Sequence, residues 1–416
     1  MDGEPAATLA PRRVLYVVSL FPILAETFIV REIQALVDKG VDVRILSLKT
    51  PRGQAIVHPE AAALLDRVRQ PQAPATAFWN TLRAVLSHPV AVTRDAAIVA
   101  AGTWRTPVAM IKSLVSMARG LEHLSWMRRF DPDFIHAHWS TYPSTAAWVL
   151  SRAAGRPFGF TCHAHDIFVD RHILARKIAD SALAVTISRH NVDWIDRNVS
   201  SLTRHKMKIV HCGVDLAQLP WSGDARDGNH ILAIGRLVAQ KGFATLIEAL
   251  ARMHADGVAF RCTVVGDGPL RKELQARIDR LGLADNITMV GALPQQAIRE
   301  LLQEATIFAL PCEIAPDGNR DGIPVALMEA MAAGCPVISC AVSGVPELIT
   351  DDVNGLLPSA NDPTALAGAL ERLLQDPALR LRLALAARQR IELEFDARKE
   401  ALKLHRLMAE ALGNAT

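Results

Sequence analysis

The sequence lacks the marks of several common protein classes. Its 416 residues carry a net charge of +3, which is too small to suggest a nucleic-acid partner. The six cysteines are scattered without a Cys-x-x-Cys pair, which excludes zinc-finger spacing and predicts buried free thiols in a reducing cytoplasm. No apolar run is long enough to span a bilayer, and the polar leader at 1–13 lacks the apolar core of a secretory signal. These absences favour a cytoplasmic protein of enzyme size.

Two familiar catalytic signatures are also missing. The run VVGDGPL at 264–270 begins like a dinucleotide-binding loop, but Arg271 occupies the position of the third glycine. No Gly-x-Ser-x-Gly nucleophile elbow occurs anywhere in the chain. The sequence therefore favours neither a dehydrogenase nor a hydrolase of that type.

What the sequence does contain is a repeated alternation of short β-branched runs and helical patterns. Half of the residues are apolar, and the length suffices for two domains with full cores. The alternation indicates βαβ units, so we predict an α/β fold of two doubly wound, Rossmann-like domains facing a central crevice, with ligands at the carboxyl ends of the strands. A stretch rich in Pro, Gly, Asp and Ser marks the linker. The predicted parts are a first domain at 1–219, a linker at 220–229, a second domain at 230–394 and a C-terminal helix at 395–416.

The most informative segment runs from Asp321 to Glu329. Gly322 and Pro324 mark a turn into a helix that ends at Gly334, so Asp321 precedes the helix and Glu329 lies inside it. Free N–H groups and the positive end of the dipole at such a helix start form a site for a diphosphate. The flanking carboxylates can accept hydrogen bonds from sugar hydroxyls. The alternative is a capping Asp and a surface Glu on an ordinary amphipathic helix.

This segment resembles the nucleotide-sugar motif of the retaining family 4 glycosyltransferases, which is Glu-x7-Glu followed by small residues and a Gly-x-Pro-Val-Ile strand. Other segments resemble the same family in the right order, at 209–215, 231–250 and 263–274. Segments of the first half resemble the branch that builds bacterial exopolysaccharides such as colanic acid, at 20–36, 134–139 and 160–168. The resemblance implies the GT-B fold, in which a C-terminal helix crosses back to the first domain.

The resemblance assigns Arg236 and Lys241 to the diphosphate of the donor. Both lie in a loop between a strand and a helix, beside Gly235 and Gly242, which permit close approach of the backbone. Fixed cations in a closed site stabilise a departing diphosphate. The other predicted donor contacts are Gly235, Gly266, Gly322, Ile323, Pro324 and Val325.

The resemblance also gives roles to the two carboxylates. Glu329 takes the place of the second Glu of the motif and is expected to accept hydrogen bonds from the ribose hydroxyls. Asp321 takes the place of the first Glu, near the donor sugar, and its side chain is one methylene shorter. We therefore expect a sugar contact that is altered or made through water.

Four histidines lie at predicted strand ends of the first domain. His165 matches the family's position facing the donor sugar, and His163 is its competitor; both are alternatively hydrogen-bonded loop residues. His136 and His138 alternate along a strand and so share one face, on the acceptor side. No third ligand accompanies this pair at metal spacing, so we expect no metal and no cofactor.

The first loop, at 19–28, has no glycine where relatives carry a glycine-rich turn. Glu26 and Thr27 are therefore candidates for contacts with the acceptor or the donor. The alternative is that they only begin the helix that follows. Together with His138 they form the predicted acceptor side.

The stretch from Phe78 to Phe130 mixes tryptophans and aliphatic residues with seven basic residues, and only Asp95 and Glu122 offset them. Such basic amphipathic helices can lie in a membrane interface, where a lipid-linked acceptor would be found. The alternative is that these helices cover the first sheet and present a basic face to water.

The leading prediction is a retaining glycosyltransferase that moves a sugar from a UDP- or GDP-sugar to a lipid-linked saccharide in exopolysaccharide biosynthesis. It is expected in the cytoplasm, with peripheral contact with the cytoplasmic face of the inner membrane as an option. One alternative is a nucleotide-sugar epimerase or hydrolase, for which only His165 and Asp321 offer an acid/base pair. Another is a non-catalytic nucleotide-sugar-binding subunit of a polysaccharide assembly complex, which the Asp321 substitution keeps open.

Overall fold

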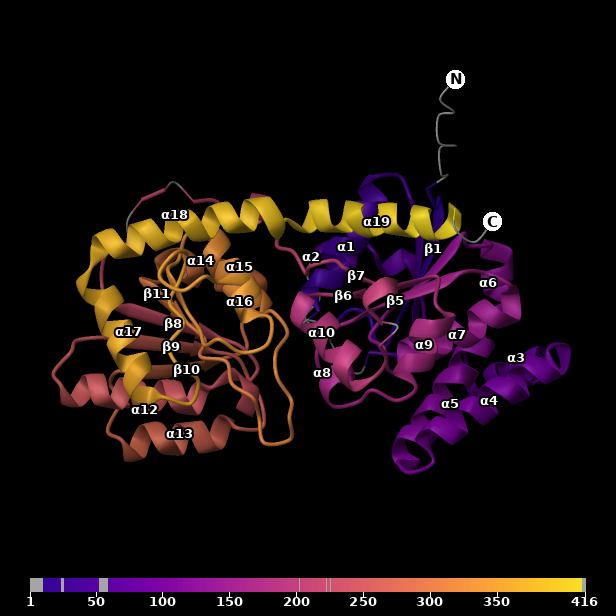
Figure 1. Ribbon diagram of the computed structural model, residues 1–416, viewed down its shortest axis with the longest axis horizontal. Helices are drawn as coiled ribbons and strands as arrows, with labels where there is room; N and C mark the ends of the chain where they lie inside the picture. The colour runs from indigo at the N-terminus through magenta and orange to yellow at the C-terminus, as the bar shows by residue number, and fades with distance from the viewer. Residues whose placement is uncertain are drawn as a thin grey trace, which may run out of the picture. The chain divides into compact units, whose positions relative to one another are not determined.

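A computed structural model of the protein describes residues 10–23, 26–51, 59–201, 203–221, 223–224 and 226–413. Residues 1–9 of the predicted leader, 222 and 225 of the predicted linker and 414–416 of the predicted C-terminal helix lie outside this part. The chain forms two compact units, and unit 1 combines the indigo to magenta part of the chain with the yellow helix α19 (Ala397–Gly413) in Figure 1. Unit 1 takes in the residues up to 187, 191–210 and those from 398 onward, and unit 2 takes in 188–190 and 211–397.

Unit 1 is built on a parallel sheet whose described strands follow the order β3-β2-β1-β4-β5-β6-β7. Strands β4 and β5 are buried along their whole length. Helices cover both faces of a parallel sheet, which explains why these strands read as nearly continuous apolar runs. The strands are β1 (Arg13–Val18), β2 (Asp42–Ser47), β3 (Val68–Arg69), β4 (Phe134–His138), β5 (Phe158–Cys162), β6 (Leu183–Thr186) and β7 (Met207–Ile209).

The helices of unit 1 form layers on this sheet (Figure 1). Helix α19 (Ala397–Gly413) places Leu404 and Met408 in the same core as Val14 and Tyr16 of β1. Its apolar residues therefore close one face of the first sheet, although they are the last described part of the chain. The other helices are α1 (Thr27–Asp38), α2 (Pro59–Ala62), α6 (Leu124–Phe130), α7 (Tyr142–Ala154), α8 (His165–Phe168), α9 (Leu174–Asp180), α10 (Arg189–Asn198) and α11 (Thr203–Lys206), with the 3-10 turn η1 (Leu65–Arg67).

Three further helices, α3 (Pro74–Ser87), α4 (Pro89–Thr103) and α5 (Pro107–Leu121), form an outer layer of unit 1. Each begins with a proline, which suits the first turn because its missing N–H is not needed there. Helix α7 packs on β1, β4 and β5 and also on α4 and α5, so it lies between the sheet and this outer layer. Nearly all of α7 is buried as a result, including the whole of Trp148.

Unit 2 has a parallel sheet whose described strands follow the order β10-β9-β8-β11-β12. They are β8 (His230–Ile234), β9 (Arg261–Val265), β10 (Ile287–Gly291), β11 (Ile307–Ala309) and β12 (Val337–Ile338). Side chains of Asp362 and Asp376 cap the last two helices of the unit, whose orphan N–H groups they satisfy. The helices are η2 (Leu216–Gln218), η3 (Ala239–Lys241), α12 (Phe243–Ala255), α13 (Arg271–Arg280), α14 (Gln295–Glu304), α15 (Val325–Ala332), α16 (Val345–Leu348), α17 (Pro363–Gln375) and α18 (Pro377–Glu394).

These two parallel α/β sheets confirm the predicted fold class. In unit 1 the strand order reverses between β1 and β4, and in unit 2 it reverses between β8 and β11. Connections leave such a switch point in opposite directions, and this opens a space outside the carboxyl ends of the strands where ligands bind. The loops after β1, β4, β8 and β11 are therefore the places at which to look for functional groups.

Candidate functional site

The switch point of unit 2 collects the predicted donor residues from distant parts of the sequence. Strand β8 is followed by Arg236, and the same loop reaches Lys241 in η3. Strand β11 leads toward Cys312, and the next loop carries Asp321 up to α15. The carboxyl ends of neighbouring parallel strands share one edge of the sheet, and these segments meet there.

Lys241 and Asp321 form an ion pair at this edge. Lys241 Nζ lies 2.9 Å from Oδ2 and 3.0 Å from Oδ1 of Asp321. The two side chains are only 15% and 19% exposed, so water and salt screen the pair weakly. Burial lowers the pKa of the Lys241 ammonium, but attraction to Asp321 outweighs it and the pKa lies above its ordinary value. Lys241 is therefore held as a cation. Cys312 Sγ lies 3.6 Å from Asp321 Oδ2 and donates a weak hydrogen bond to it.

Arg236 is exposed beside this pair, and its guanidinium has no ion pair with any described residue. Two nearby glycines keep the surrounding loops close together. Gly266 has φ +137°, and a Cβ there would overlap the carbonyl oxygen of Gly235; Gly242 has φ +69°, and a Cβ would overlap that of Pro311. Glycine is required at both positions. Gly235 and Gly266 were predicted as donor contacts, and in the structure they hold the loops that carry Arg236 and Lys241.

Helix α15 brings Glu329 to a buried position. Glu329 is 7% exposed and accepts a 3.1 Å hydrogen bond from Gln295 Nε2 of α14. The N-cap of α15 is Pro324, with no side-chain capping bond, and Asp321 pairs with Lys241 instead. The alternative of a capping Asp and a surface Glu is therefore wrong.

The turn before α15 is tightly packed. Gly322, Ile323 and Pro324 are buried and Val325 is half-buried. Ile323 belongs to the core of unit 2, so its side chain faces away from any ligand. Only backbone groups of this turn are available to a phosphate, and Pro324 has no N–H to offer. A role for these four residues in the donor site remains a prediction.

The switch point of unit 1 carries a polar cluster on β1, β4 and α1. Glu32 of α1 stands at its centre: Oε1 accepts a 2.8 Å hydrogen bond from the Tyr16 hydroxyl and lies 3.0 Å from His138 Nε2. His138 Nδ1 lies 3.3 Å from His163 Nε2. His136 Nε2 lies 2.9 Å from the hydroxyl of Thr161 on β5. His138, a predicted acceptor-side residue, therefore belongs to a buried network that extends over three strands.

Burial and the neighbouring charges set the protonation of this cluster. Burial and then repulsion from His138 lower the pKa of His136 to about 3, so this ring is neutral at physiological pH. Burial also lowers the pKa of His163 well below its ordinary value. Burial raises the pKa of Glu32, but attraction to His138 and hydrogen bonds outweigh it, and the pKa lies below its ordinary value. Glu32 is therefore the fixed negative charge of the cluster.

Glu26 and Thr27 begin α1 next to the cluster. Glu26 is the N-cap residue, yet its side chain makes no capping hydrogen bond. Burial raises the pKa of Glu26 to about 7, while attraction to His138 and a hydrogen bond with Trp139 oppose the rise. Glu26 thus points to the polar cluster and titrates near neutral pH. Thr27 is half-buried at the first position of the helix, which agrees with the helix-start interpretation.

The segment after β5 separates His163, His165 and Asp166. His163 is buried against Phe28, with ring centroids 4.9 Å apart, whereas His165 is exposed at the start of α8. Asp166 is fully buried and accepts hydrogen bonds of 2.6 Å from the Ser140 N–H and 2.9 Å from the His163 N–H. Of the two candidate histidines, only His165 is open to a ligand.

A buried lysine reinforces the loop after β4. Lys177 Nζ of α9 donates hydrogen bonds to the carbonyl oxygens of Ser140 and Thr141, at 2.6 and 2.7 Å. Burial lowers its pKa to about 7, against attraction from Asp170 and Asp166. Together, Lys177 and Asp166 fix the loop between β4 and α7 from two sides.

Sequence reasoning missed Tyr16, Glu32, Asp166 and Lys177. Tyr16 reads as a core residue of an apolar strand, and Glu32 and Lys177 read as solvent-facing positions of amphipathic helices. Asp166 carried a usable signal, because it directly follows His165 at a strand end.

His136 and His138 do have a third ligand-type group beside them, so the expectation of none is wrong. Glu32, His136 and His138 present ligand atoms that all lie within 4.8 Å of one another. His138 Nε2 and Glu32 are already hydrogen-bonded to each other, and Tyr16 donates to the same carboxylate. A cation bound by these three residues would have to replace the Glu32–His138 contact.

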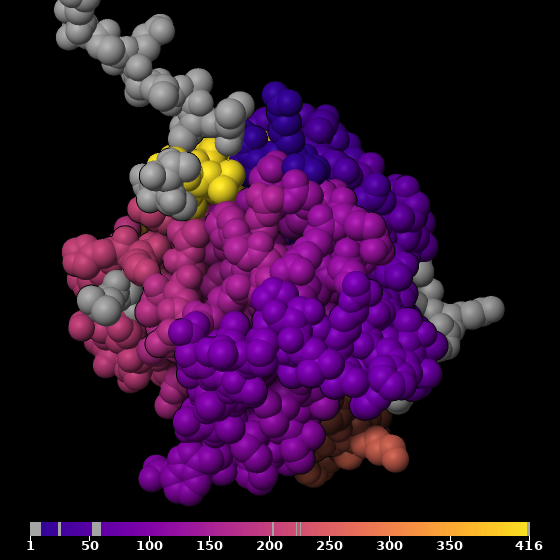
Figure 2. All heavy atoms as spheres, turned by 90° about the vertical axis from the view of Figure 1, so that its right-hand side faces the viewer, coloured from indigo at the N-terminus to yellow at the C-terminus, as the bar shows by residue number. Residues whose placement is uncertain are grey.

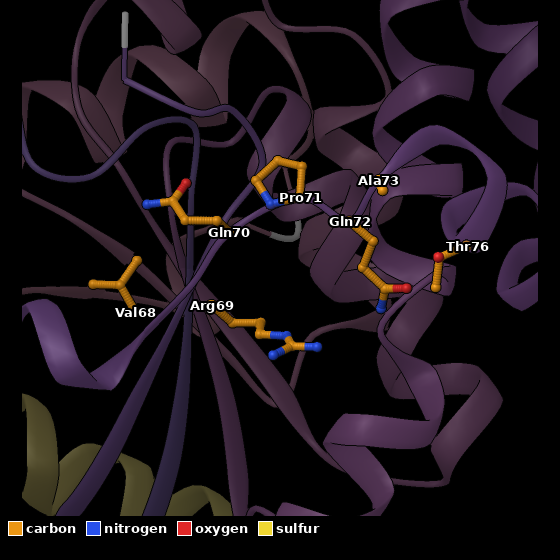
Figure 3. Close-up of a pocket in the computed structure, with 7 residues that line it drawn as sticks. All are labelled: Val68, Arg69, Gln70, Pro71, Gln72, Ala73 and Thr76. Carbon is orange, nitrogen blue, oxygen red and sulfur yellow. The ribbon is translucent and has the colours of Figure 1, made fainter. Parts of the chain in front are cut away.

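A surface hollow of about 460 Å³ lies at the carboxyl end of β3, where the chain enters α3. Figure 3 shows the Arg69 guanidinium and the amides of Gln70 and Gln72 around it. All strands of this sheet are parallel, so the hollow lies at the same edge of the sheet as the polar cluster. It lies on an outer strand, however. Its lining mixes apolar side chains with polar ones and carries one cation, Arg69.

Two family models match the chain in succession. Glycosyltransferase Family 4 matches residues 25–218, and Glycosyl transferases group 1 matches residues 220–390. The amylovoran biosynthesis glycosyltransferase AmsK of Erwinia amylovora is 40% identical over 48% of this chain and 52% of its own length. The putative colanic acid biosynthesis glycosyltransferase WcaL of Escherichia coli K12 is 36% identical over 46% and 48%. The chain thus spans about half the length of these curated relatives.

Solved structures share the fold over nearly the whole chain. Anabaena HepE in complex with UDP and glucose has a TM-score of 0.67 and 17% identity, covering 96% of this chain and 100% of that one. Sucrose-phosphate synthase of Thermosynechococcus elongatus has a TM-score of 0.70 and 19% identity, covering 97% and 100%. At these identities the likeness establishes the fold.

Proposed function

We propose that this chain, which belongs to the family 4 glycosyltransferases, transfers a sugar from a nucleoside diphosphate sugar to a saccharide acceptor in exopolysaccharide biosynthesis. The observation that carries the proposal is the Lys241–Asp321 ion pair beside the exposed Arg236 at the switch point of unit 2. The relatives named for amylovoran and colanic acid biosynthesis support the pathway class. A UDP complex of a protein with the same fold supports a nucleotide-sugar donor.

The donor half of the mechanism follows from charge. Cleavage of the bond between sugar and diphosphate places new negative charge on the leaving phosphate, and preorganised cations stabilise that charge best when water is excluded. Lys241 is buried and kept protonated by Asp321, and Arg236 is free to approach the diphosphate. Glu329 is assigned to the ribose hydroxyls, with Gln295 orienting its carboxylate. Asp321 acts in the first place by keeping Lys241 protonated. In this it differs from a residue whose only role is to contact the sugar.

The acceptor half is assigned to unit 1. A hydroxyl that attacks the sugar must lose a proton, and the departing phosphate oxygen takes it in a reaction that retains configuration. The polar cluster around His138 and Glu26 positions the acceptor hydroxyl, and His165 contacts the donor sugar. We propose a UDP- or GDP-sugar as donor and a lipid-linked saccharide as acceptor, with no metal in the transfer step. The reaction would take place in the cytoplasm, at its membrane face.

The test is the release of nucleoside diphosphate from a panel of UDP- and GDP-sugars by the purified protein, with and without a lipid extract from the producing cells. Release from one donor that depends on the extract is expected, with the sugar found on the lipid fraction. Clear donor binding without turnover in the presence of extract would overturn transfer and favour the non-catalytic binding subunit. Release of a changed free sugar or sugar nucleotide would favour a hydrolase or an epimerase.

A further inference from the structure

The outer helices of unit 1 expose an unusual amount of apolar surface. Half of the large apolar side chains that are exposed in the described part of the chain lie within α3–α5 and the turn that joins α4 to α5. They include Phe78, Trp79 and Trp104, which are 62%, 65% and 65% exposed. The full set is Phe78, Trp79, Leu86, Val90, Trp104, Val108, Ile111 and Val115. Exposed apolar groups gathered in this way mark a surface that binds something.

These side chains form stripes along the helices. On α3, Trp79, Arg83 and Leu86 recur at helical spacing on one side. On α5, Val108, Ile111, Lys112 and Val115 do the same, and all four are exposed. Figure 2 shows the purple helices standing out at the lower part of this face of unit 1. We call the exposed side of α3–α5 the outer face.

The exposed charges of the outer face have one sign. Between Pro74 and Leu121 the exposed basic residues are Arg83, Arg94, Arg105 and Lys112, whereas Arg119 is half-buried and pairs with the buried Glu122 at 3.3 Å. The one acidic residue in that stretch is Asp95, which is 1% exposed and is therefore absent from the surface. At the turn between α4 and α5, the Arg105 guanidinium lies 5.0 Å from the centre of the Trp104 ring. Apolar and aromatic groups combined with cations alone suit an anionic, partly apolar partner.

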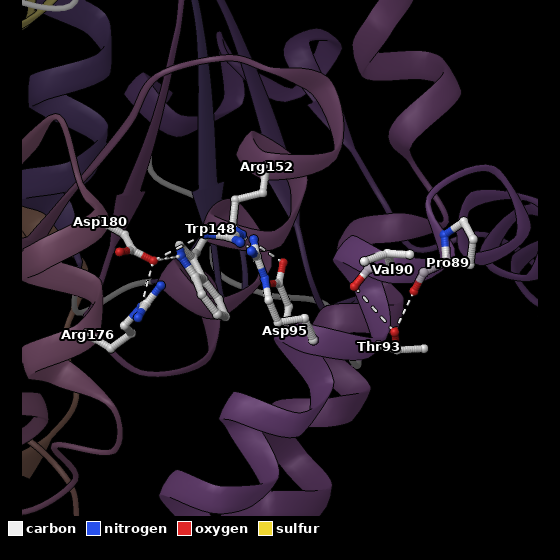
Figure 4. A network of polar contacts seen from close by, with 9 residues as sticks. Pro89, Val90, Thr93, Asp95, Trp148, Arg152, Arg176 and Asp180 are labelled. Atoms are coloured by element: carbon white, nitrogen blue, oxygen red, sulfur yellow. Dashed lines mark hydrogen bonds and ion pairs between the residues drawn. The ribbon is translucent and has the colours of Figure 1, made fainter.

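The helices are firmly attached, so the apolar exposure is a property of the folded layer. Asp95 of α4 pairs with Arg152 of α7 at 3.0 Å. Arg152 also reaches Asp180 of α9, which accepts hydrogen bonds from Trp148 and Arg176, at 3.0 and 2.8 Å. Figure 4 shows this network linking the outer helix to the body of the unit.

In the described residues no single helix is both long and apolar enough to cross a bilayer. Helices α3 and α4 pass that test only when taken together, and the chain bends by 107° between them. A helix that binds a membrane without crossing it lies in the interface. Its apolar stripe faces the acyl chains and its cations lie at the lipid phosphates.

We infer that the outer face of α3–α5 binds the surface of an anionic lipid bilayer. Phe78, Trp79 and Trp104 enter the headgroup region, while Arg83 and Lys112 contact lipid phosphates. A second copy of the chain fits this face poorly, because association would bring two sets of cations together. This inference rests on the proposed function in one respect only: binding to the membrane would keep the enzyme where a lipid-linked acceptor is found.

The experiment is co-flotation of the full-length protein with vesicles. Vesicles of phosphatidylcholine with about 30% phosphatidylglycerol are compared with pure phosphatidylcholine, at low and high salt. We expect binding to the anionic vesicles that salt weakens. The triple variant F78S/W79S/W104S should partition at least about tenfold less into the vesicles. The double variant R83Q/K112Q, which removes two exposed cations, should weaken binding to the anionic vesicles alone.

The matched control is L385S/L393S, which removes two exposed leucines of α18 and should leave vesicle binding unchanged. Thermal unfolding of each variant checks that it is folded. Equal flotation of the folded triple variant and the wild type would overturn the inference. So would a concentration-dependent dimer of the wild type that the triple variant lacks, since a second copy would then occupy this face. Donor turnover measured without vesicles, with the lipid extract dissolved in detergent, should stay unchanged in the triple variant, so a failure here is distinguishable from a failure of the proposed function.

Discussion

The two switch points of the chain hold charge in opposite ways. In unit 2, Lys241 is kept cationic by Asp321, and Arg236 is exposed beside it. In unit 1, burial keeps His136 neutral, and the central carboxylate of Glu32 is satisfied by its neighbours. A permanent positive charge suits a ligand that is always anionic. Polar groups that are already hydrogen-bonded to one another suit a ligand with neutral hydroxyls. The same sheet topology thus carries two different charge arrangements, which a few loop and helix residues set.

The largest effect is expected from Arg236→Ala, which removes the exposed cation of unit 2. The transfer rate at saturating donor should fall by at least about 100-fold, because charge on the leaving diphosphate loses a preorganised partner. The measurement is kcat for the donor found in the panel. Arg252→Ala is the matched control: Arg252 is also exposed, but it lies at the far end of α12. Near-normal turnover of Arg236→Ala would exclude its role at the leaving group.

A smaller loss is expected from Asp321→Asn, which removes the partner of Lys241. Burial then lowers the pKa of Lys241 without compensation, so less ammonium is present as the pH rises. Turnover should fall about tenfold at mildly alkaline pH and recover as the pH is lowered. Asp321→Glu keeps the charge and should restore most of the activity. A loss in Asp321→Asn that is independent of pH would show that Asp321 acts on the sugar and not through Lys241.

In unit 1 the corresponding test is Glu26→Gln. The pKa of Glu26 is about 7, above its ordinary value, so the carboxylate form appears only as the pH rises through neutrality. If this carboxylate orients the acceptor, turnover should rise across that range in the wild type and lose this dependence in the variant, with a decrease of about fivefold above neutral pH. Asp38→Asn, an exposed acid on the same helix, serves as the control. An unchanged pH profile in Glu26→Gln would remove Glu26 from the site.

The smallest effect is expected from Cys312→Ser. Burial raises the pKa of the Cys312 thiol, so it remains neutral and offers Asp321 only a weak hydrogen bond. A hydroxyl can make the same contact, and turnover should change by less than about threefold. Alkylation by a thiol reagent should also be slow, because the side chain is buried. A large loss would mean that the ion pair depends on the sulfur.

The residues assigned to the donor have a local signal in the sequence, whereas the polar cluster of unit 1 has none. Asp321 and Glu329 lie in one short segment, and Arg236 and Lys241 in another, so family patterns in the sequence contain them. These residues lie close together because of the strand order. The alternation of strands and helices in the sequence indicates that order only roughly. The pairing of Lys241 with Asp321 joins residues 80 positions apart, and only the folded structure reveals it.

The polar cluster of unit 1 consists of residues whose sequence context is ordinary. Glu32 lies in an amphipathic helix, and nothing in the spacing of α1 distinguishes it from a solvent-facing acid. It becomes central because the helix packs its polar side against β1 and β4 at the switch point. The same packing supplied the third ligand-type group that the sequence argument had excluded. Long-range packing of this kind leaves no pattern in a single sequence.

Helix α7 also explains why the outer layer of unit 1 is not an optional attachment. The helix is covered by the sheet on one side and by α4 and α5 on the other, and it has almost no position that faces water. A shortened chain without residues 74–121 would leave a bare apolar helix, and would be expected to aggregate. The outer layer therefore also covers the apolar surface of α7, and the rest of unit 1 needs this cover in order to stay in solution.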